Sequence, residues 1–208
     1  MDATRAAAAR RGLSLEYAGA AWMLIEALVA ITAGVAARSV LLTAFGFDSV
    51  IELLSAAALA RRLSFEARGA PAADVERLEH RTARVSAVLL ILLCAYIVVT
   101  SLAGLALGIR PSSSPFGIAV AAVAVVAMPL LAVAKGRVNR VLDSASLRAD
   151  IAETASCALL AATTLFGLAA SEILNLWWIQ YAAALALLVW LVPETREAIE
   201  SRSGAREG

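Results

Sequence analysis

The sequence predicts an all-α membrane protein with six transmembrane helices and both termini in the cytoplasm. Of the 208 residues, 61% are hydrophobic and the mean hydropathy is +0.80, whereas soluble domains are usually nearer half apolar. Apolar runs long enough to cross the hydrocarbon core of a bilayer recur along the chain. The basic residues also concentrate in alternate connections, which is typical of multi-pass membrane proteins.

The first three predicted helices are bounded by clear breaks in the apolar pattern. The first follows a polar, arginine-bearing segment without a small-residue cleavage site, so we interpret it as a span and not as a signal peptide. The second follows a very short turn around Arg38. Before the third, the segment ADVERLEHRTAR predicts a helix that begins outside the bilayer. The predicted spans are 17–37, 40–60 and 85–107.

The last three helices are bounded in the same way. The connector GIRPSSSP, rich in Pro and Ser, predicts a turn before the fourth. The fourth contains Pro129, which a transmembrane helix tolerates when its neighbours satisfy the freed carbonyl group. The predicted spans are 116–134, 147–169 and 174–192. Little of the chain is left over, so we expect one six-helix transmembrane domain over residues 1–208.

The distribution of basic residues predicts the topology. Only Arg38 and Arg110 lie in the odd-numbered connections; the other sixteen of the 18 Lys and Arg residues lie in the terminal segments and the even-numbered connections. By the positive-inside rule, both termini face the cytoplasm, and an even number of spans agrees with this. We therefore expect a multi-pass protein of the cytoplasmic (inner) membrane.

The sequence contains no motif of soluble nucleotide or thiol chemistry. GxGxxG, Walker, HExxH and CxxC patterns are absent, and no nucleophile–base pair is visible. Cys94 and Cys157 both fall within predicted spans, so we expect free thiols and no disulfide. We expect no enzyme, no permanently bound cofactor and no nucleic-acid partner.

Acidic residues within the spans are the feature that needs an explanation. Glu26, Asp48, Glu52 and Glu153 lie inside predicted spans, and Asp150 lies near the cytoplasmic entry of the fifth. An ionised side chain at bilayer depth costs about 2.5–3.5 kcal/mol even on insertion scales. Since all Lys and Arg residues lie outside the predicted spans or at their ends, none compensates these acids at bilayer depth. The acids must therefore be protonated, hydrogen-bonded, in contact with water or bound to a cation.

The spacing of these residues forms two stripes. Asp48 and Glu52 are four residues apart and share one helix face, and Ser55 lies on the same stripe. In the fifth span, Glu153 and Cys157 are also four residues apart. With a rise of about 1.5 Å per residue, Glu52 and Cys157 each lie about 12 Å from the cytoplasmic helix ends, Asp48 about 18 Å and Glu153 about 6–9 Å. Two antiparallel stripes can therefore supply four ligands to one tetrahedral cation site.

These two pairs resemble the transmembrane domain of the cation diffusion facilitator (cation efflux) family. The family's fifth helix has Ala-Asp, two residues, a ligand, three residues and a second ligand, and ADIAETASC is similar, with Asp150 at the Asp and Glu153 and Cys157 at the ligand places. SVLLTAFGFDSVIELLS is similar to the second helix, with Asp48 and Glu52 at its ligand places. The resemblance covers nearly the whole chain. It implies a divalent metal transporter that exports its ion by antiport with protons.

The sequence departs from this family in two respects. Family members commonly have His or Asp where this chain has Glu153 and Cys157. They also commonly carry a cytosolic metal-sensing and dimerising domain after the sixth helix, whereas about fifteen residues follow Val192 here. We therefore expect the transmembrane domain alone. Whether the chain forms the homodimer that is usual in the family stays open.

The donor set leaves several transported metals open. One Asp, two Glu and one Cys suit zinc, iron(II), cobalt, manganese or cadmium, and the resemblance ranks zinc first, with iron or manganese next. Glu26, Asp150 and Ser55 are candidates for partners of the ligands or for proton carriers. Glu26 is equally a candidate for a hydrogen-bonded clamp between helices, and Asp150 for a cap of the fifth helix.

Two other functions fit the same residues. The chain could be a non-transporting membrane scaffold or sensor whose buried acids are protonated links between helices. It could also carry an organic cation coupled to protons, which would need an aromatic-lined cavity for which Trp22 and Phe45 are the candidates.

Overall fold

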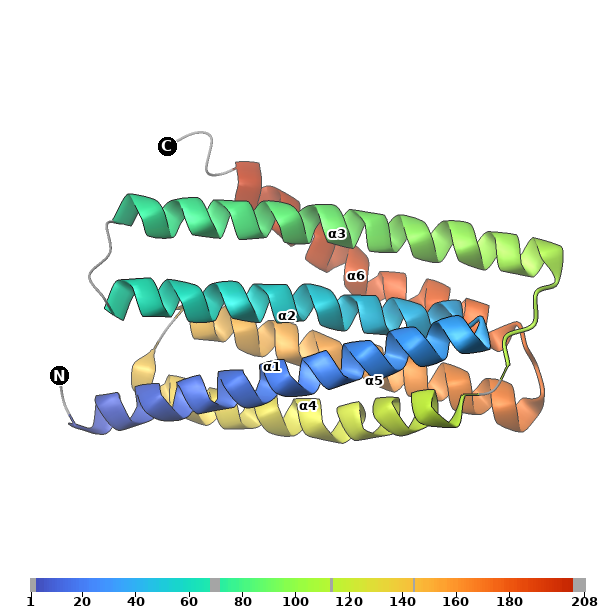
Figure 1. Ribbon diagram of the computed structural model, residues 1–208, viewed down its shortest axis with the longest axis horizontal. Coiled ribbons are helices and arrows are strands. Elements are labelled where there is room, and N and C mark those ends of the chain that lie inside the picture. The colour runs from blue at the N-terminus through green and yellow to red at the C-terminus, as the bar shows by residue number, and fades with distance from the viewer. Residues whose placement is uncertain (1–2, 68–71, 113, 144, 204–208) are drawn as a thin grey trace.

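The computed structural model describes residues 3–67, 72–112, 114–143 and 145–203. Within these ranges the chain forms six α-helices and no strand, which confirms the predicted all-α class. The helices run side by side in alternating directions, and the start of the first and the end of the last lie toward the same end of the bundle (Figure 1). They are α1 (Ala3–Ala37), α2 (Val40–Ala67), α3 (Ala72–Leu107), α4 (Pro115–Leu142), α5 (Ala145–Leu174) and α6 (Ile179–Ser203).

Five of these helices are long and apolar enough to cross a membrane, among the residues that the structure describes. This makes the chain a multi-pass membrane protein. The candidate spans overlap the first five predicted ones; they are Arg10–Ala37, Val40–Ala57, Ala87–Leu107, Pro115–Leu142 and Asp150–Leu174.

The predicted start of the sixth span at residue 174 is wrong. Helix α5 continues to Leu174, the chain turns through Asn175 with a left-handed φ of 52°, and α6 begins at Ile179. The described part of α6 is less apolar than the other helices because it contains Gln180 near its start and Glu194 and Arg196 toward its end.

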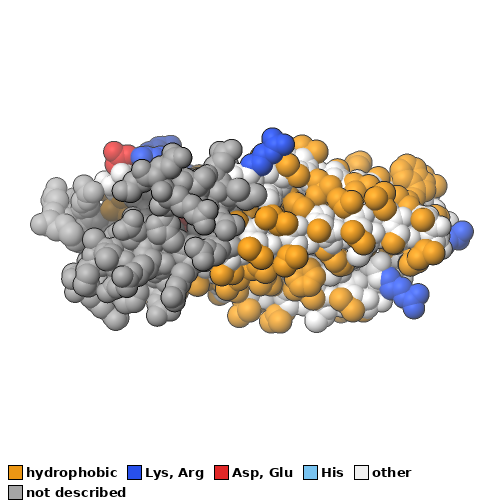
Figure 2. Space-filling model, turned by 90° about the horizontal axis from the view of Figure 1, so that it is seen from above, with side chains coloured by type: hydrophobic (Ala, Val, Ile, Leu, Met, Phe, Trp, Pro, Cys, Tyr) orange, Lys and Arg blue, Asp and Glu red, His pale blue; other side chains and the backbone are white. Residues whose placement is uncertain are grey.

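The described surface is largely apolar. On the face that Figure 2 shows, hydrophobic side chains are spread over the described part of the bundle, with a few charged side chains among them. Phe116, Phe166 and Ile173 are 76%, 72% and 79% exposed. Large side chains with this exposure are unfavourable in water but are at home among lipid tails, so this surface suits the hydrocarbon region of a membrane.

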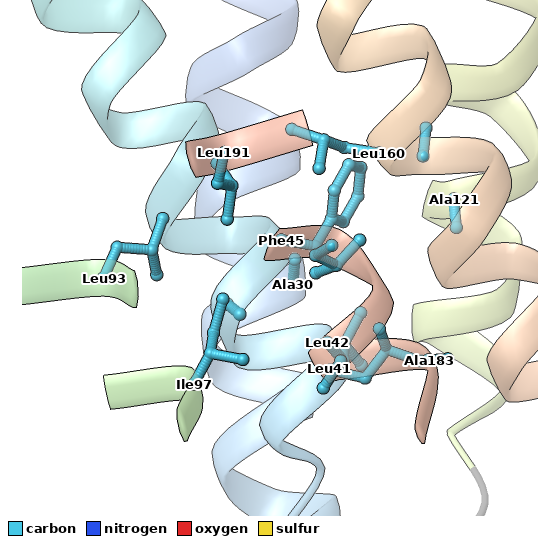
Figure 3. Close-up of a cluster of buried hydrophobic side chains, with 14 of the residues drawn as sticks. Ala30, Leu41, Leu42, Phe45, Leu93, Ile97, Ala121, Leu160, Ala183 and Leu191 are labelled. Atoms are coloured by element: carbon cyan, nitrogen blue, oxygen red, sulfur yellow. The ribbon is translucent and has the colours of Figure 1, made fainter. Parts of the chain in front are cut away.

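Helix α2 is the central helix of the bundle. It packs against α1, α3, α5 and α6. Of its candidate membrane span, 61% is buried inside the bundle, whereas 28–39% of each other candidate span is buried. Figure 3 shows Leu41, Leu42 and Phe45 of α2 among buried side chains that include Leu160 of α5 and Leu191 of α6. Polar side chains on the inner face of α2 are therefore surrounded by protein and not by lipid.

A tight connection presses α1 against α2. Arg38 adopts a left-handed φ of 54°, and the Ser39 side chain accepts a hydrogen bond from the Leu42 amide at 3.3 Å, which caps the start of α2. Farther along, a Cβ atom added to Gly46 would lie 2.8 Å from the backbone nitrogen of Ile31. The absence of a side chain at Gly46 thus allows the two helices to approach closely, two residues before the first acid of α2.

Candidate metal centre

Three of the predicted ligands converge in the middle of the bundle. Asp48 and Glu52 of α2 are 2% and 3% exposed, and Cys157 of α5 is fully buried. Their ligand atoms all lie within 4.8 Å of one another. In a tetrahedral site with metal–ligand bonds of about 2.0–2.3 Å, neighbouring ligand atoms are about 3.5 Å apart. Small side-chain rotations are therefore enough to bring the three atoms to one ion.

Two oxygen atoms of this group lack hydrogen-bond partners. Asp48 Oδ2 and Glu52 Oε2 are buried, and neither accepts a hydrogen bond from the residues that the structure describes. Buried polar atoms in proteins are almost always paired, because an unpaired one costs about 1–3 kcal/mol and more when charged. A cation is the kind of partner that would satisfy both oxygens at once.

Glu153 does not belong to this three-residue group. It is half-buried in α5, and its side chain interacts with Ser55 of α2. Ser55 therefore adjoins the centre through Glu153. The predicted stripes thus meet, but the structure brings three of the four predicted ligands together, and the four-ligand set stays a prediction.

Glu26 of α1 is a hydrogen-bond partner of Cys157. Its Oε2 accepts a hydrogen bond from Trp22 Nε1 at 2.7 Å, and its Oε1 accepts one from Ser49 Oγ at 2.6 Å. The Cys157 thiol also donates to Oε1, at 3.9 Å. Both interpretations of Glu26 therefore apply: it links α1 to α2, and it is a hydrogen-bond partner of one candidate ligand.

Asp150 is held by a buried lysine. Lys135 Nζ donates to Asp150 Oδ2 at 2.6 Å, to Glu16 Oε2 at 3.1 Å and to Thr154 Oγ1 at 3.4 Å. All four side chains are buried. We refer to Glu16, Lys135, Asp150 and Thr154 as the lysine network; it joins α1, α4 and α5.

The lysine network corrects two expectations. Lys135 is predicted to lie just outside the fourth span, but α4 continues beyond residue 134 to Leu142 and places Lys135 inside a candidate span. The sequence predicts Asp150 to be a partner of the ligands, a proton carrier or a cap of the fifth helix. It lies in the second turn of α5, which begins at Ala145, and its carboxylate is paired with Lys135.

Glu194 of α6 is a residue of the centre that the sequence did not single out. Glu194 lies close enough to Asp48, Glu52 and Glu153 to interact with them, so four carboxyl groups from three helices are neighbours here. Glu194 was passed over because the apolar run ends at residue 192. Its spacing of three residues from the buried Leu191, which places both on the same face of α6, could have identified it.

The arrangement can hold a positively charged ligand. Carboxylate oxygens from α2 and a thiol from α5 surround one position, and the nearby carboxyl groups make it electronegative. Divalent transition-metal ions accept this mixture of oxygen and sulfur donors. The chain matches no protein-family model and no curated protein.

Proposed function

We propose that this chain is a divalent metal cation transporter of the cytoplasmic membrane that exports its ion in exchange for protons, as the resemblance to the cation diffusion facilitator family implies. Zinc is the first choice of ion, with iron or manganese next. The observation that carries the proposal is the pair of unpartnered, buried oxygens, Asp48 Oδ2 and Glu52 Oε2, within 4.8 Å of the Cys157 ligand atom.

In this proposal Asp48, Glu52 and Cys157 bind the ion, and Glu153 supplies the fourth ligand. Glu153 is one helical turn from Cys157, on the same face of α5. It would exchange its interaction with Ser55 for the ion when the helices move between inward-open and outward-open states.

Exchange with protons follows from the surroundings of the ligands. A carboxyl or thiol group in a medium of low dielectric constant retains its proton more readily than in water, and a bound cation reverses this preference. Metal entry therefore releases protons from the ligands, and proton entry releases the metal. Each ion then crosses in one direction as protons cross in the other.

Six passes with both termini in the cytoplasm complete the proposal. The start of α1 and the end of α6 lie toward the same end of the bundle (Figure 1), which supports an even number of passes. Helix α6 packs along α3 and α5, and its charged C-terminal part would leave the membrane on the cytoplasmic side.

The scaffold or sensor function is less well supported by these contacts. A protonated acid that links helices should have its oxygens paired across a helix interface, as both Glu26 oxygens are with Trp22 and Ser49. The unpartnered oxygens of Asp48 and Glu52 do not fit that role. An organic-cation carrier is also less well supported, because the two aromatic residues proposed to line its cavity have other roles. Trp22 donates a hydrogen bond to Glu26, and Phe45 is buried in the apolar core.

The test is metal flux into proteoliposomes that contain the purified chain. Zinc, iron(II), manganese, cobalt and cadmium are offered with and without a pH gradient, to wild type, Asp48→Ala and the control Glu172→Ala. Glu172 is an acid of α5 that is exposed and distant in sequence from the centre. Because even the hydrogen-bond partners of metal ligands change affinity about 10–100-fold, we expect Asp48→Ala to reduce flux by about 100-fold or more.

The control separates loss of the centre from loss of folding. Glu172→Ala should transport like wild type, and Asp48→Ala should elute as a folded protein from a sizing column. Equal flux in Asp48→Ala and wild type would refute the proposed site. If folded wild type transported none of the five ions, the scaffold or organic-cation functions would take its place.

A further inference from the structure

The sulfur atoms of this chain are unevenly distributed. The chain has two cysteines and three methionines, of which one is Met1. Both other methionines, Met23 of α1 and Met128 of α4, are buried in one cluster with Cys157 of α5. Three helices thus bring three of the four internal sulfur atoms together.

This sulfur cluster borders the candidate metal centre, because Cys157 belongs to both. The ligand atom of Cys157 lies within 4.8 Å of the carboxylates of Asp48 and Glu52. Cys157 also shares a buried cluster with the two methionines, against which further apolar side chains pack. These partly buried neighbours are Trp22, Leu53, Leu131 and Ala158. We refer to the carboxylates of α2 as the oxygen face of the centre, and to the cluster of Met23, Met128 and Cys157 from α1, α4 and α5 as the sulfur face.

The two faces favour different ions. Carboxylates alone suit hard ions such as magnesium and manganese, whereas thiolate and thioether sulfur bind softer, more polarisable ions. Methionine is also a common filler of irregular cores, so its position beside a cysteine would not suffice. Here, however, the same cysteine adjoins Asp48 and Glu52, whose buried oxygens lack partners.

We infer that Met23, Met128 and Cys157 form a sulfur face that makes this centre selective for polarisable d10 ions, with cadmium bound ahead of zinc and both ahead of manganese. In this inference at least one thioether sulfur contacts the bound cadmium ion. The inference rests on the proposed function, since it concerns the ion that the same centre binds.

Calorimetric titration of the purified full chain with cadmium and with manganese tests the inference. The variants are Met23→Leu, Met128→Leu and the double variant. Leu is nearly equal to Met in volume, and exchanges that conserve volume are the best tolerated in a packed core. We expect the double variant to bind cadmium about tenfold more weakly, which corresponds to about 1.4 kcal/mol, and to bind manganese as wild type does.

A second measurement avoids substitution altogether. The protein is produced with selenomethionine, loaded with cadmium and measured by X-ray absorption at the cadmium edge. Because Met23 and Met128 share a buried cluster with Cys157 among the described residues, a selenium atom at bonding distance from cadmium would be assigned to one of them. Absence of selenium at that distance would overturn the inference, whatever the variants do.

The outcomes also separate this inference from the proposed function. If the double variant keeps wild-type cadmium affinity, or loses cadmium and manganese equally, the methionines only pack and the inference fails. The proposed function then still stands, provided that Asp48→Ala abolishes binding. If wild type binds no metal at all, both fail together.

Discussion

Loss of Lys135 should strongly destabilise the protein, because it leaves the buried carboxyl groups of the lysine network without a cation, and replacing Lys135 by Met tests this. Lys135 is 1% exposed and its ammonium group lies 2.6 Å from Asp150 Oδ2 and 3.1 Å from Glu16 Oε2. In the variant Lys135→Met, two buried carboxyl groups face each other without a cation. Removal of one partner from a buried ion pair costs about 3–5 kcal/mol. For a chain of this size we expect the melting temperature to fall by about 6–20 °C.

The chain contains a matched control for burial. Arg148 Nη1 and Asp143 Oδ1 are also 2.6 Å apart, but their side chains are 58% and 88% exposed. An exposed pair contributes about 0–1 kcal/mol, so Arg148→Met should change the melting temperature by only about 0–4 °C.

Thermal unfolding in detergent is followed by the reaction of the buried Cys157 thiol with a fluorogenic maleimide. The triple variant Lys135→Met, Glu16→Gln, Asp150→Asn, in which no charge is left unpaired in the network, should regain part of the lost stability. Equal, small shifts in melting temperature for Lys135→Met and Arg148→Met would refute the reasoning. Burial of an ion pair would then not increase the stability lost when its cation is removed.

Two further predictions concern helix packing and access to the centre. Gly46→Ala should lower the melting temperature by about 2–12 °C, because the new Cβ would lie 2.8 Å from the Ile31 backbone nitrogen and overpacking costs about 1–3 kcal/mol. The control Gly136→Ala should be neutral or stabilising, because a Cβ atom at Gly136 would meet no atom within 4 Å. Zinc should slow alkylation of Cys157, measured by peptide mass spectrometry, and this protection should vanish in Asp48→Ala; protection that persists would place zinc elsewhere.

Part of this site could be predicted because it depends on local periodicity alone. Residues four apart on a helix share a face in any helix, so the pairing of Asp48 with Glu52 needed no knowledge of the neighbours. Counting the rise per residue also placed Glu52 and Cys157 at equal depth, and the structure brings these two together.

The boundaries of the apolar runs were a weaker guide. The rule that a span ends at a charge excluded Lys135 and Glu194 from the predicted helices. Both lie in helices that continue past these residues, and both charges have partners or neighbours on other helices: Lys135 on α1 and α5, and Glu194 near the acids of α2 and α5. A charge is tolerated at such a depth because of what lies across the helix interface.

The sequence by itself therefore determined the class of the protein, its apolar helices and the two ligand stripes, because these depend on composition and on the geometry of a single helix. The tertiary structure alone decided that Glu153 interacts with Ser55 outside the three-residue group, that Asp150 pairs with Lys135, and that Met23, Met128 and Cys157 share one buried cluster. Those contacts join helices far apart in the chain, and their partners are selected by how whole helix faces pack together.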